Sequence, residues 1–482
     1  MNTTTSNNYN NSKSFFDPAN SNKDIIASLD IGTTKICALI ARVGEDGVLD
    51  VLGVGTADSK GIMRGVINNV SEAINSIKAA VSQAELQSGM RISRVVVGIA
   101  GQHIKCFKHR NYLTREIDNF ITISDIEDLV NQVRRIVLPS GEKIIHVLPV
   151  TYKVNNDEGI INPIGMRCTS LEGDFLIVTG NKDSIENIKK CVEEAGLQIA
   201  ELVLEPIASS IAVLNDREKD AGVALVDIGG GTTDVAIFFD GIIRHTAVIP
   251  FGGSIITQDV IDGCEVMKDD AELLKINHGS SLVLEKFENV IISIPDRFSD
   301  GNGEPSKVSM KNLALIIHAR VEEILEEVYN HIRESEFDSK LRAGVVLTGG
   351  GSLLSNIDEH CRYLCGMRSR KGGVAHRLKN KSSKVNSPKF ATAVGLIVKG
   401  NELVKIGELD SNFVSLNETE ESNKGTIIER PVDDGFMKPS LVKDEAPKEK
   451  PGVVERLFTR MERLFTNQKK DSPDFNNDDE DF

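Results

Sequence analysis

Two turns of the sequence have the residue types that bind a polyphosphate. Each turn joins an aspartate to glycines and threonines between two apolar stretches, at 30–35 and again at 227–233. Glycines let backbone N–H groups approach phosphate oxygens, threonine hydroxyls add donors, and an aspartate at a strand end can hold hydrated Mg²⁺. We therefore predict that both turns close on one polyphosphate. The residues are Asp30, Gly32, Thr33, Thr34 and Lys35 in the first turn, and Asp227, Gly229, Gly230, Gly231, Thr232 and Thr233 in the second, with Asp30 and Asp227 on Mg²⁺ through water.

A third glycine segment supports this interpretation. One such turn alone would favour an ordinary hairpin connection. A buried-type strand at 345–348, however, also runs into glycines and a helix start, which suits an adenosine or α-phosphate packed against bare backbone. A P-loop is excluded and a dinucleotide fold is disfavoured, because neither glycine fingerprint is present. The residues of this adenosine turn are Gly349, Gly350, Gly351 and Ser352.

The elements around these turns indicate a layered α/β fold. Apolar β-branched runs alternate with amphipathic stretches, as in layered α/β proteins. Between the first turn and residue 205, strand-like segments flank a helix with a capping signal at 121–133, which predicts a compact inserted α+β unit. Other expected strands are 94–99, 223–226 and 343–347, and other expected helices are 70–88, 184–195 and 313–334.

Composition limits the class of protein. The chain has 482 residues, of which 40% are hydrophobic, and a net charge of −15. That charge argues against a general nucleic-acid binder, which gains affinity through Lys and Arg. Seven scattered cysteines suggest a reducing compartment rather than a disulfide framework. We expect no signal peptide and no membrane span, because no apolar run is long enough.

The order of these motifs resembles the actin, Hsp70 and sugar-kinase superfamily. The inserted unit, with its Asp-Glu-Gly-Ile-x-Asn-Pro-x-Gly segment at 157–165, resembles the subdomain that distinguishes the bacterial cell-division family FtsA from its relatives. The resemblance implies a two-lobed actin-like (ribonuclease H-like) fold that binds ATP and Mg²⁺. It also implies that the segment at 387–396 is a second connecting helix on which the lobes hinge.

Three further residues take roles from this resemblance. Glu205, which starts the first connecting helix, would face the γ-phosphate and orient the attacking water; a plain Glu-Pro helix start is the alternative. Glu272 and Lys275 have the Glu-x-x-Lys spacing that relatives use for the ribose. Because they share one helix face, a surface salt bridge is an equal alternative. We expect ATP hydrolysis to be slow or absent.

The segment near the C-terminus has a helical apolar face. At about 100° per residue, its large apolar residues fall on a single arc flanked by arginines, which suits an anionic membrane surface. Docking on the globular domain or coiled-coil pairing are the alternatives. The apolar residues are Val453, Val454, Leu457, Phe458, Met461, Leu464 and Phe465, and the basic ones are Arg456, Arg460 and Arg463.

These signals divide the chain into ordered lobes and flexible ends. The polar N-terminus, the linker before the amphipathic helix and the acidic tail lack the apolar periodicity of folded domains. The expected parts are a disordered 1–22, a first lobe at 23–97 and 176–218, an inserted subdomain at 98–175, a second lobe at 219–400, a flexible linker at 401–450, an amphipathic helix at 451–467 and an acidic tail at 468–482.

The FtsA resemblance implies an actin-like filament protein at the cytoplasmic face of the membrane, at the division septum. It would polymerise head-to-tail, bind the tubulin-like protein FtsZ and anionic lipid, and recruit later division proteins; no nucleic acid is expected. A pilus-assembly actin homologue, a sugar-kinase-type phosphotransferase and an Hsp70-like chaperone are the alternatives. The chaperone would need a β-rich substrate domain after residue 400.

Two other groups of residues could suggest ligands. His103 and His146 invite a metal site, but no carboxylate or cysteine stands at ligand spacing, so we interpret them as ordinary hydrogen-bonded histidines. A basic stretch at 368–384 favours a solvated loop over a nucleic-acid site.

Overall fold

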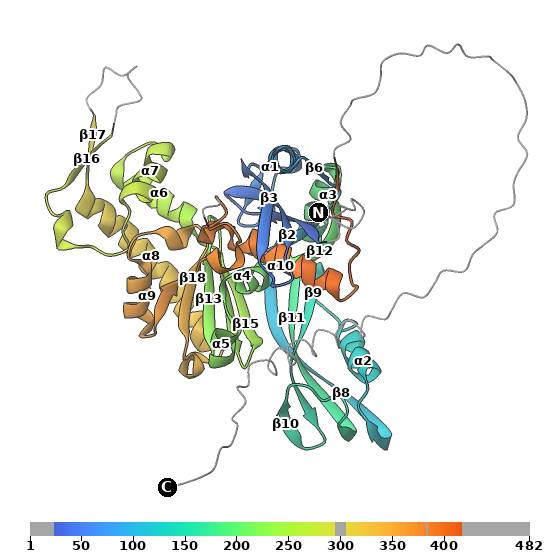
Figure 1. Ribbon diagram of the computed structural model, residues 1–482. Coiled ribbons are helices and arrows are strands. Elements are labelled where there is room, and N and C mark those ends of the chain that lie inside the picture. The colour runs from blue at the N-terminus through green and yellow to red at the C-terminus, as the bar shows by residue number, and fades with distance from the viewer. Residues whose placement is uncertain (1–23, 295–304, 382–383, 417–482) are drawn as a thin grey trace, which may run out of the picture.

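The computed structural model describes residues 24–294, 305–381 and 384–416. Two five-stranded sheets stand side by side, and a third, four-stranded sheet projects away from them (Figure 1). The buried hydrophobic residues form three clusters, one centred on each of these units, and the largest cluster also includes residues of the other two sheets. The expected α/β class is confirmed.

The first lobe is built on the sheet β12-β7-β1-β2-β3. Strand β1 is buried at every position, because it is a central strand with both faces covered. It pairs antiparallel with β2 and parallel with β7, so the first turn connects two neighbouring strands. The bounds are Ile25–Ile31 for β1, Lys35–Val43 for β2, Leu49–Asp58 for β3, Arg94–Ile99 for β7 and Gln198–Leu204 for β12.

The second lobe repeats this plan with the sheet β15-β14-β13-β18-β19. Strands β13 and β14 form the second hairpin, and β18 joins β13 in parallel, as β7 joins β1. The duplication predicted from two turns therefore extends to whole sheets. The bounds are Val223–Ile228 for β13, Thr233–Phe239 for β14, Ile242–Ile249 for β15, Gly344–Thr348 for β18 and Ser369–Lys371 for β19.

Helices cover both sheets. Helix α1 has the bounds expected from its periodicity, because Asn69 caps its first turn and Gly89 ends it in the left-handed conformation at φ 69°. Helices α4 and α10 lie against each other between the two sheets. The bounds are Val70–Ser88 for α1, Lys182–Glu194 for α3, Glu205–Val213 for α4, Asp216–Ala221 for α5, Gly253–Cys264 for α6, Lys268–His278 for α7, Met310–Glu334 for α8, Ile357–Cys365 for α9 and Ala391–Lys405 for α10.

The inserted subdomain is an antiparallel sheet with one helix. Its strands follow the order β10-β9-β11-β8, and α2 is held by a capping box in which Thr122 and Asp125 bond each other's backbone. This confirms the α+β unit expected from the sequence. The bounds are Lys105–Phe120 for β8, Ile123–Val133 for α2, Glu142–Val154 for β9, Asp157–Ile160 for β10 and Arg167–Asn181 for β11.

The expected boundary at residue 400 is wrong, because α10 continues to Lys405 and a further strand follows. That strand, β20 (Val414–Leu416), pairs with β6 (Met90–Ile92), and the side chain of Phe413 is fully buried beside it. The remaining short strands are β4 (Ile62–Met63), β5 (Val66–Ile67), β16 (Ile291–Ile294) and β17 (Ser306–Ser309).

Candidate functional site

The two predicted turns meet face to face between the lobes. A Cβ placed on Gly230 would lie 2.2 Å from Cγ2 of Thr34, and one placed on Gly231 would lie 2.6 Å from Oγ1 of Thr33. Only glycine permits this approach of the second hairpin to the first. The structure therefore brings together the two hairpins that the sequence predicts to share one ligand.

Four carboxylates gather behind these hairpins. Burial raises the pKa of Asp30 to about 6, opposed by the Lys35 ammonium and reinforced by the charge of Asp227. Burial also raises the pKa of Glu205 well above its usual range, with further contributions from the charges of Asp30, Asp234 and Asp227. Buried acids that repel one another form a site that a cation would stabilise.

Both connecting helices reach the carboxylate of Asp227. Ser209 of α4 donates to Asp227 Oδ2 at 2.5 Å, and Thr392 of α10 donates to the same oxygen at 3.4 Å. Burial raises the pKa of Asp227, while these two hydrogen bonds lower it. The helices themselves pack closely, since a Cβ on Gly395 would lie 1.8 Å from the carbonyl oxygen of Ala208. The carboxylate of Asp227 is therefore hydrogen-bonded to both helices between the lobes, so a change in its position or charge acts directly on them.

Asp234, the last residue of the second hairpin motif, belongs to the same cluster, although our site prediction omitted it. Burial and the charge of Asp227 raise its pKa to about 8, opposed by a hydrogen bond from Thr232. Its Oδ1 is buried and has no hydrogen-bond partner within the described residues. An orphaned buried carboxylate oxygen fits a site for a hydrated cation such as Mg²⁺. The sequence already pointed to this residue, because Asp234 directly follows the two threonines of the second turn.

The adenosine turn lies directly against Asp227. Gly349 has φ +81°, and a Cβ there would be 2.2 Å from Asp227 Oδ1. A Cβ on Gly351 would clash with Ile228 at the end of β13. Ser352 is buried and donates to the Gly349 carbonyl at 2.8 Å, so its hydroxyl holds the turn in shape. The third predicted segment thus adjoins the second hairpin.

Lys35 lies beside the hairpins, but its ammonium is directed to the start of α10. It donates to the carbonyl of Lys389 at 2.7 Å and lies 3.9 Å above the Phe390 ring. This contact is a hydrogen bond reinforced by a cation–π interaction. Lys35 therefore connects the first hairpin to the second connecting helix.

Glu272 and Lys275 form a salt bridge of 2.7 Å on one face of α7. Lys275 also donates to the Gly253 carbonyl at 2.9 Å, and the Gly253 amide donates to the Gly229 carbonyl of the second hairpin at 2.8 Å. The salt bridge expected as one alternative is therefore formed. The pair is also linked to the second hairpin through the start of α6. The two interpretations are compatible.

The structure also shows the contacts of the two histidines and of the basic stretch at 368–384. His146 accepts a hydrogen bond from the Leu204 amide at 3.1 Å, as expected. For His103 the expectation is wrong, because both ring nitrogens are buried without a hydrogen-bond partner among the described residues, and burial lowers its pKa. The basic stretch is not simply a solvated loop, since Arg370 binds Glu218 at 2.6 Å from a strand of the second sheet.

Other predicted segments cannot be placed. The helix expected at 451–467 and its membrane-facing residues lie outside the described residues, as do 1–22 and 468–482. No helix in the described part of the chain has the length and apolar character needed to cross a membrane.

The fold is that of a two-lobed actin-like protein. It has two sheets with the same strand order, a hairpin from each sheet, and two helices that pack between them. Family models described as "Cell division protein FtsA" and "SHS2 domain inserted in FTSA" match residues 224–395 and 101–179. The cell division protein FtsA of Pseudomonas aeruginosa is 34% identical and covers 84% of this chain and 96% of its own length. Those of Neisseria meningitidis and Escherichia coli K12 are 36% and 31% identical over 77% and 80% of this chain, and 89% and 93% of their own. The chain belongs to the FtsA family of cell division proteins, and its role is in cell division.

More distant similarities concern the fold. A model described as "Hsp70 protein" matches residues 181–245. A chain of a PilM–PilN type IV pilus biogenesis complex matches 78% of this chain and 98% of its own at TM-score 0.56 and 14% identity. MreB5 of Spiroplasma citri bound to ADP matches 80% and 99% at TM-score 0.50 and 16% identity. At such identities the likeness establishes the two-lobed fold alone.

Proposed function

We propose that this protein is an ATP-binding adaptor of the division machinery. The observation that carries the proposal is the meeting of both hairpins, the adenosine turn and four carboxylates, three of them buried, at one place between the lobes. Membership in the FtsA family supports the cellular role. ATP would contact residues of both lobes, so binding would favour a closed arrangement of the lobes over an open one.

The chain's own residues divide the work at this site. Asp30 and Asp227 would hold Mg²⁺ through water, and the nearby carboxylate of Asp234 would add negative charge that favours the ion. Mg²⁺ would neutralise phosphate charge. The backbone amides and threonines of the two hairpins would bind the phosphates. Glu205 lies among the same carboxylates, where burial raises its pKa, and it would orient the attacking water.

The further proposals concern partners. The amphipathic face at 453–465 would lie in an anionic membrane surface, chains would assemble head-to-tail, and the filament would tether FtsZ to the cytoplasmic membrane at the septum and recruit later division proteins. The support is the apolar arc flanked by three arginines, together with family membership. No helix of the described residues could supply a membrane span instead.

Liposome co-sedimentation tests the adaptor proposal. The full chain is compared with a chain ending at residue 450 and with the full-length variant Phe458→Asp, on vesicles with and without anionic lipid, with Mg²⁺, ATP and FtsZ. We expect only the intact apolar face to bring FtsZ into the pellet with anionic vesicles. Equal sedimentation of all three chains would refute the tether. A vesicle-free pellet that requires ATP would separately report self-assembly.

A further inference from the structure

A second cluster of ligand-type side chains lies away from the nucleotide site. His318 and Glu322 stand one turn apart on α8, and His360 is on the neighbouring helix α9. One ligand atom from each lies within 4.8 Å of the other two. Two imidazoles and one carboxylate are the donor set of many transition-metal sites in proteins.

The surroundings of His318 orient its ring as a ligand. Nδ1 of His318 lies 2.7 Å from the carbonyl oxygen of Ser281. Since a carbonyl can only accept, Nδ1 carries the proton, and the lone pair of Nε2 points to the side where Glu322 Oε2 lies 3.8 Å away. A backbone carbonyl that fixes the tautomer in this way is the usual outer support of a metal-bound histidine.

His360 provides a second and independent observation. Its side chain is buried at 4% exposure, yet Nδ1 has no hydrogen-bond partner within the described residues. Its ring lies nearly parallel to that of His318, with centroids 4.5 Å apart. An orphaned buried nitrogen is costly unless something binds it. A metal ion shared with His318 and Glu322 would satisfy it.

We propose that His318, Glu322 and His360 form a site for one divalent transition ion of the zinc class. Ligand atoms around tetrahedral zinc are about 3.4 Å apart, so the three ligand atoms would close by no more than about 1.5 Å. The two stacked imidazole rings would also turn out of parallel, so that a nitrogen of each points to the ion. The two nitrogens select against Mg²⁺, which prefers oxygen. The fourth position would be left to water or another ligand.

This site would be connected to the adenosine turn. The Ser281 amide donates to the carbonyl of Ser355 at 2.9 Å, and the Ser281 hydroxyl reaches the same oxygen at 3.2 Å. Ser355 follows the adenosine turn and precedes α9. A metal ion would therefore join α8, α9 and the segment at Ser281 into one unit at the back of that turn, and stabilise the second lobe.

The test is metal binding by the untagged full-length chain. Zn²⁺ affinity is measured by competition with a chromophoric chelator, and coordination is monitored in the Co²⁺ absorption spectrum. We expect one Zn²⁺ per chain, unaffected by excess Mg²⁺, with affinity at least about tenfold weaker in His318→Gln and Glu322→Gln. His360→Gln should behave likewise, and its melting curve without metal verifies that it folds.

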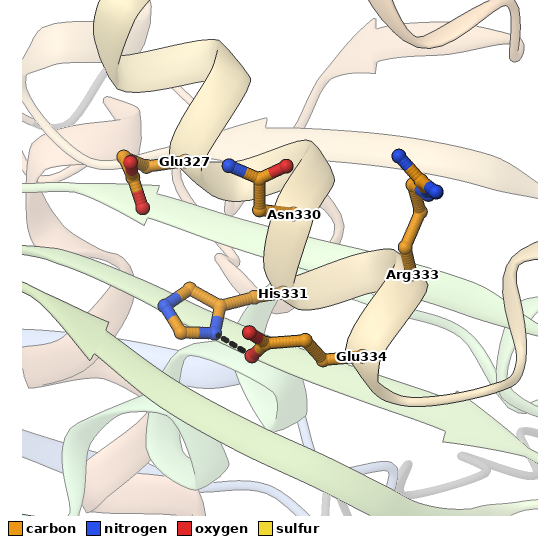
Figure 2. Close-up of a pocket in the computed structure, with 5 residues that line it drawn as sticks. All are labelled: Glu327, Asn330, His331, Arg333 and Glu334. Carbon is orange, nitrogen blue, oxygen red and sulfur yellow. Dashed lines mark hydrogen bonds and ion pairs between the residues drawn. The ribbon is translucent and has the colours of Figure 1, made fainter.

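His331→Gln is the matched control. His331 lies on the same helix and contacts Glu334 at 3.0 Å (Figure 2), but among the described residues no third ligand atom lies within 4.8 Å of that pair, as His360 does for His318 and Glu322. The control should bind like the unmodified chain. Equal affinity in all variants would overturn the proposal. So would a Co²⁺ spectrum dominated by thiolate charge transfer, which would place the ion on cysteines such as Cys361 and Cys365, whose sulfurs are 4.0 Å apart.

Discussion

Replacing Asp30 by Asn should stabilise the protein without nucleotide while weakening its binding of Mg²⁺ and ATP. The folded state raises the pKa of Asp30 from 3.8 to about 6, so its ionised form is disfavoured by about 3 kcal/mol at pH 7. Asparagine keeps the size and removes that charge. With about 380 folded residues and the usual unfolding entropy per residue, the gain corresponds to a melting temperature higher by about 4 °C.

The pH dependence follows from the sign of this shift. A raised carboxyl pKa contributes stability that is fully present below 3.8 and is lost as the pH rises through about 6. The stability difference between Asp30→Asn and the unmodified chain should therefore be small near pH 4, grow between pH 4 and 6, and stay constant above pH 7. Burial of Asp30 is the main cause of the raised pKa, opposed by the Lys35 ammonium and reinforced by the charge of Asp227.

Differential scanning fluorimetry across pH, with and without Mg²⁺ and ATP, measures both effects. Without ligand, Asp30→Asn should melt higher than the unmodified chain; with Mg²⁺ and ATP the order should reverse, because only the unmodified chain gains from binding. Asp24→Asn, an exposed position just before the same strand, is the control and should change neither curve. A lower melting temperature for Asp30→Asn at pH 8 without ligand would refute the reasoning.

Three further substitutions probe the same site. Gly349→Val should lower the melting temperature and weaken ATP binding at least tenfold in calorimetry, because its side chain would meet the Asp227 carboxylate at a positive φ; normal binding would contradict the tight turn. Glu205→Gln should keep ATP affinity within about threefold and lower any phosphate release at least tenfold, which a phosphate-release assay measures; unchanged release would exclude it as the water-orienting residue. Gly395→Val should lower the free energy of unfolding by at least about 3 kcal/mol, because the valine side chain would overlap the Ala208 carbonyl. Denaturant unfolding measures this, and a curve that matches the unmodified chain would show that the helices can separate.

Much of the fold was predictable because its signals are local. Helix α1 has an Asn cap, a periodic apolar face and a terminal glycine, and its bounds are those expected. The boundary after residue 400 failed for the opposite reason. Strand β20 is three residues long and is fixed by pairing with β6 and by burial of Phe413, a contact that no local pattern encodes.

The site was predictable where chemistry repeats in the sequence. Two Asp-Ile-Gly turns and one glycine run located three segments that the structure brings together. Residues whose role depends on tertiary neighbours were missed: Ser209 and Thr392 are ordinary helix residues until both donate to Asp227. The cluster of His318 and His360 likewise comes from two helices that are separated in the chain, whereas spacing arguments examine only neighbours.

The central claim is that both hairpins and the adenosine turn hold one ATP between the lobes. Isothermal titration of the full-length chain with ATP in the presence of Mg²⁺ tests it most directly, using Asp227→Asn, Gly349→Val and the control Asp24→Asn. We predict one ATP per chain, at least tenfold weaker binding in the two site variants, and unchanged binding in the control. Absence of ATP binding by the unmodified chain, or equal affinity in all four proteins, would contradict the account.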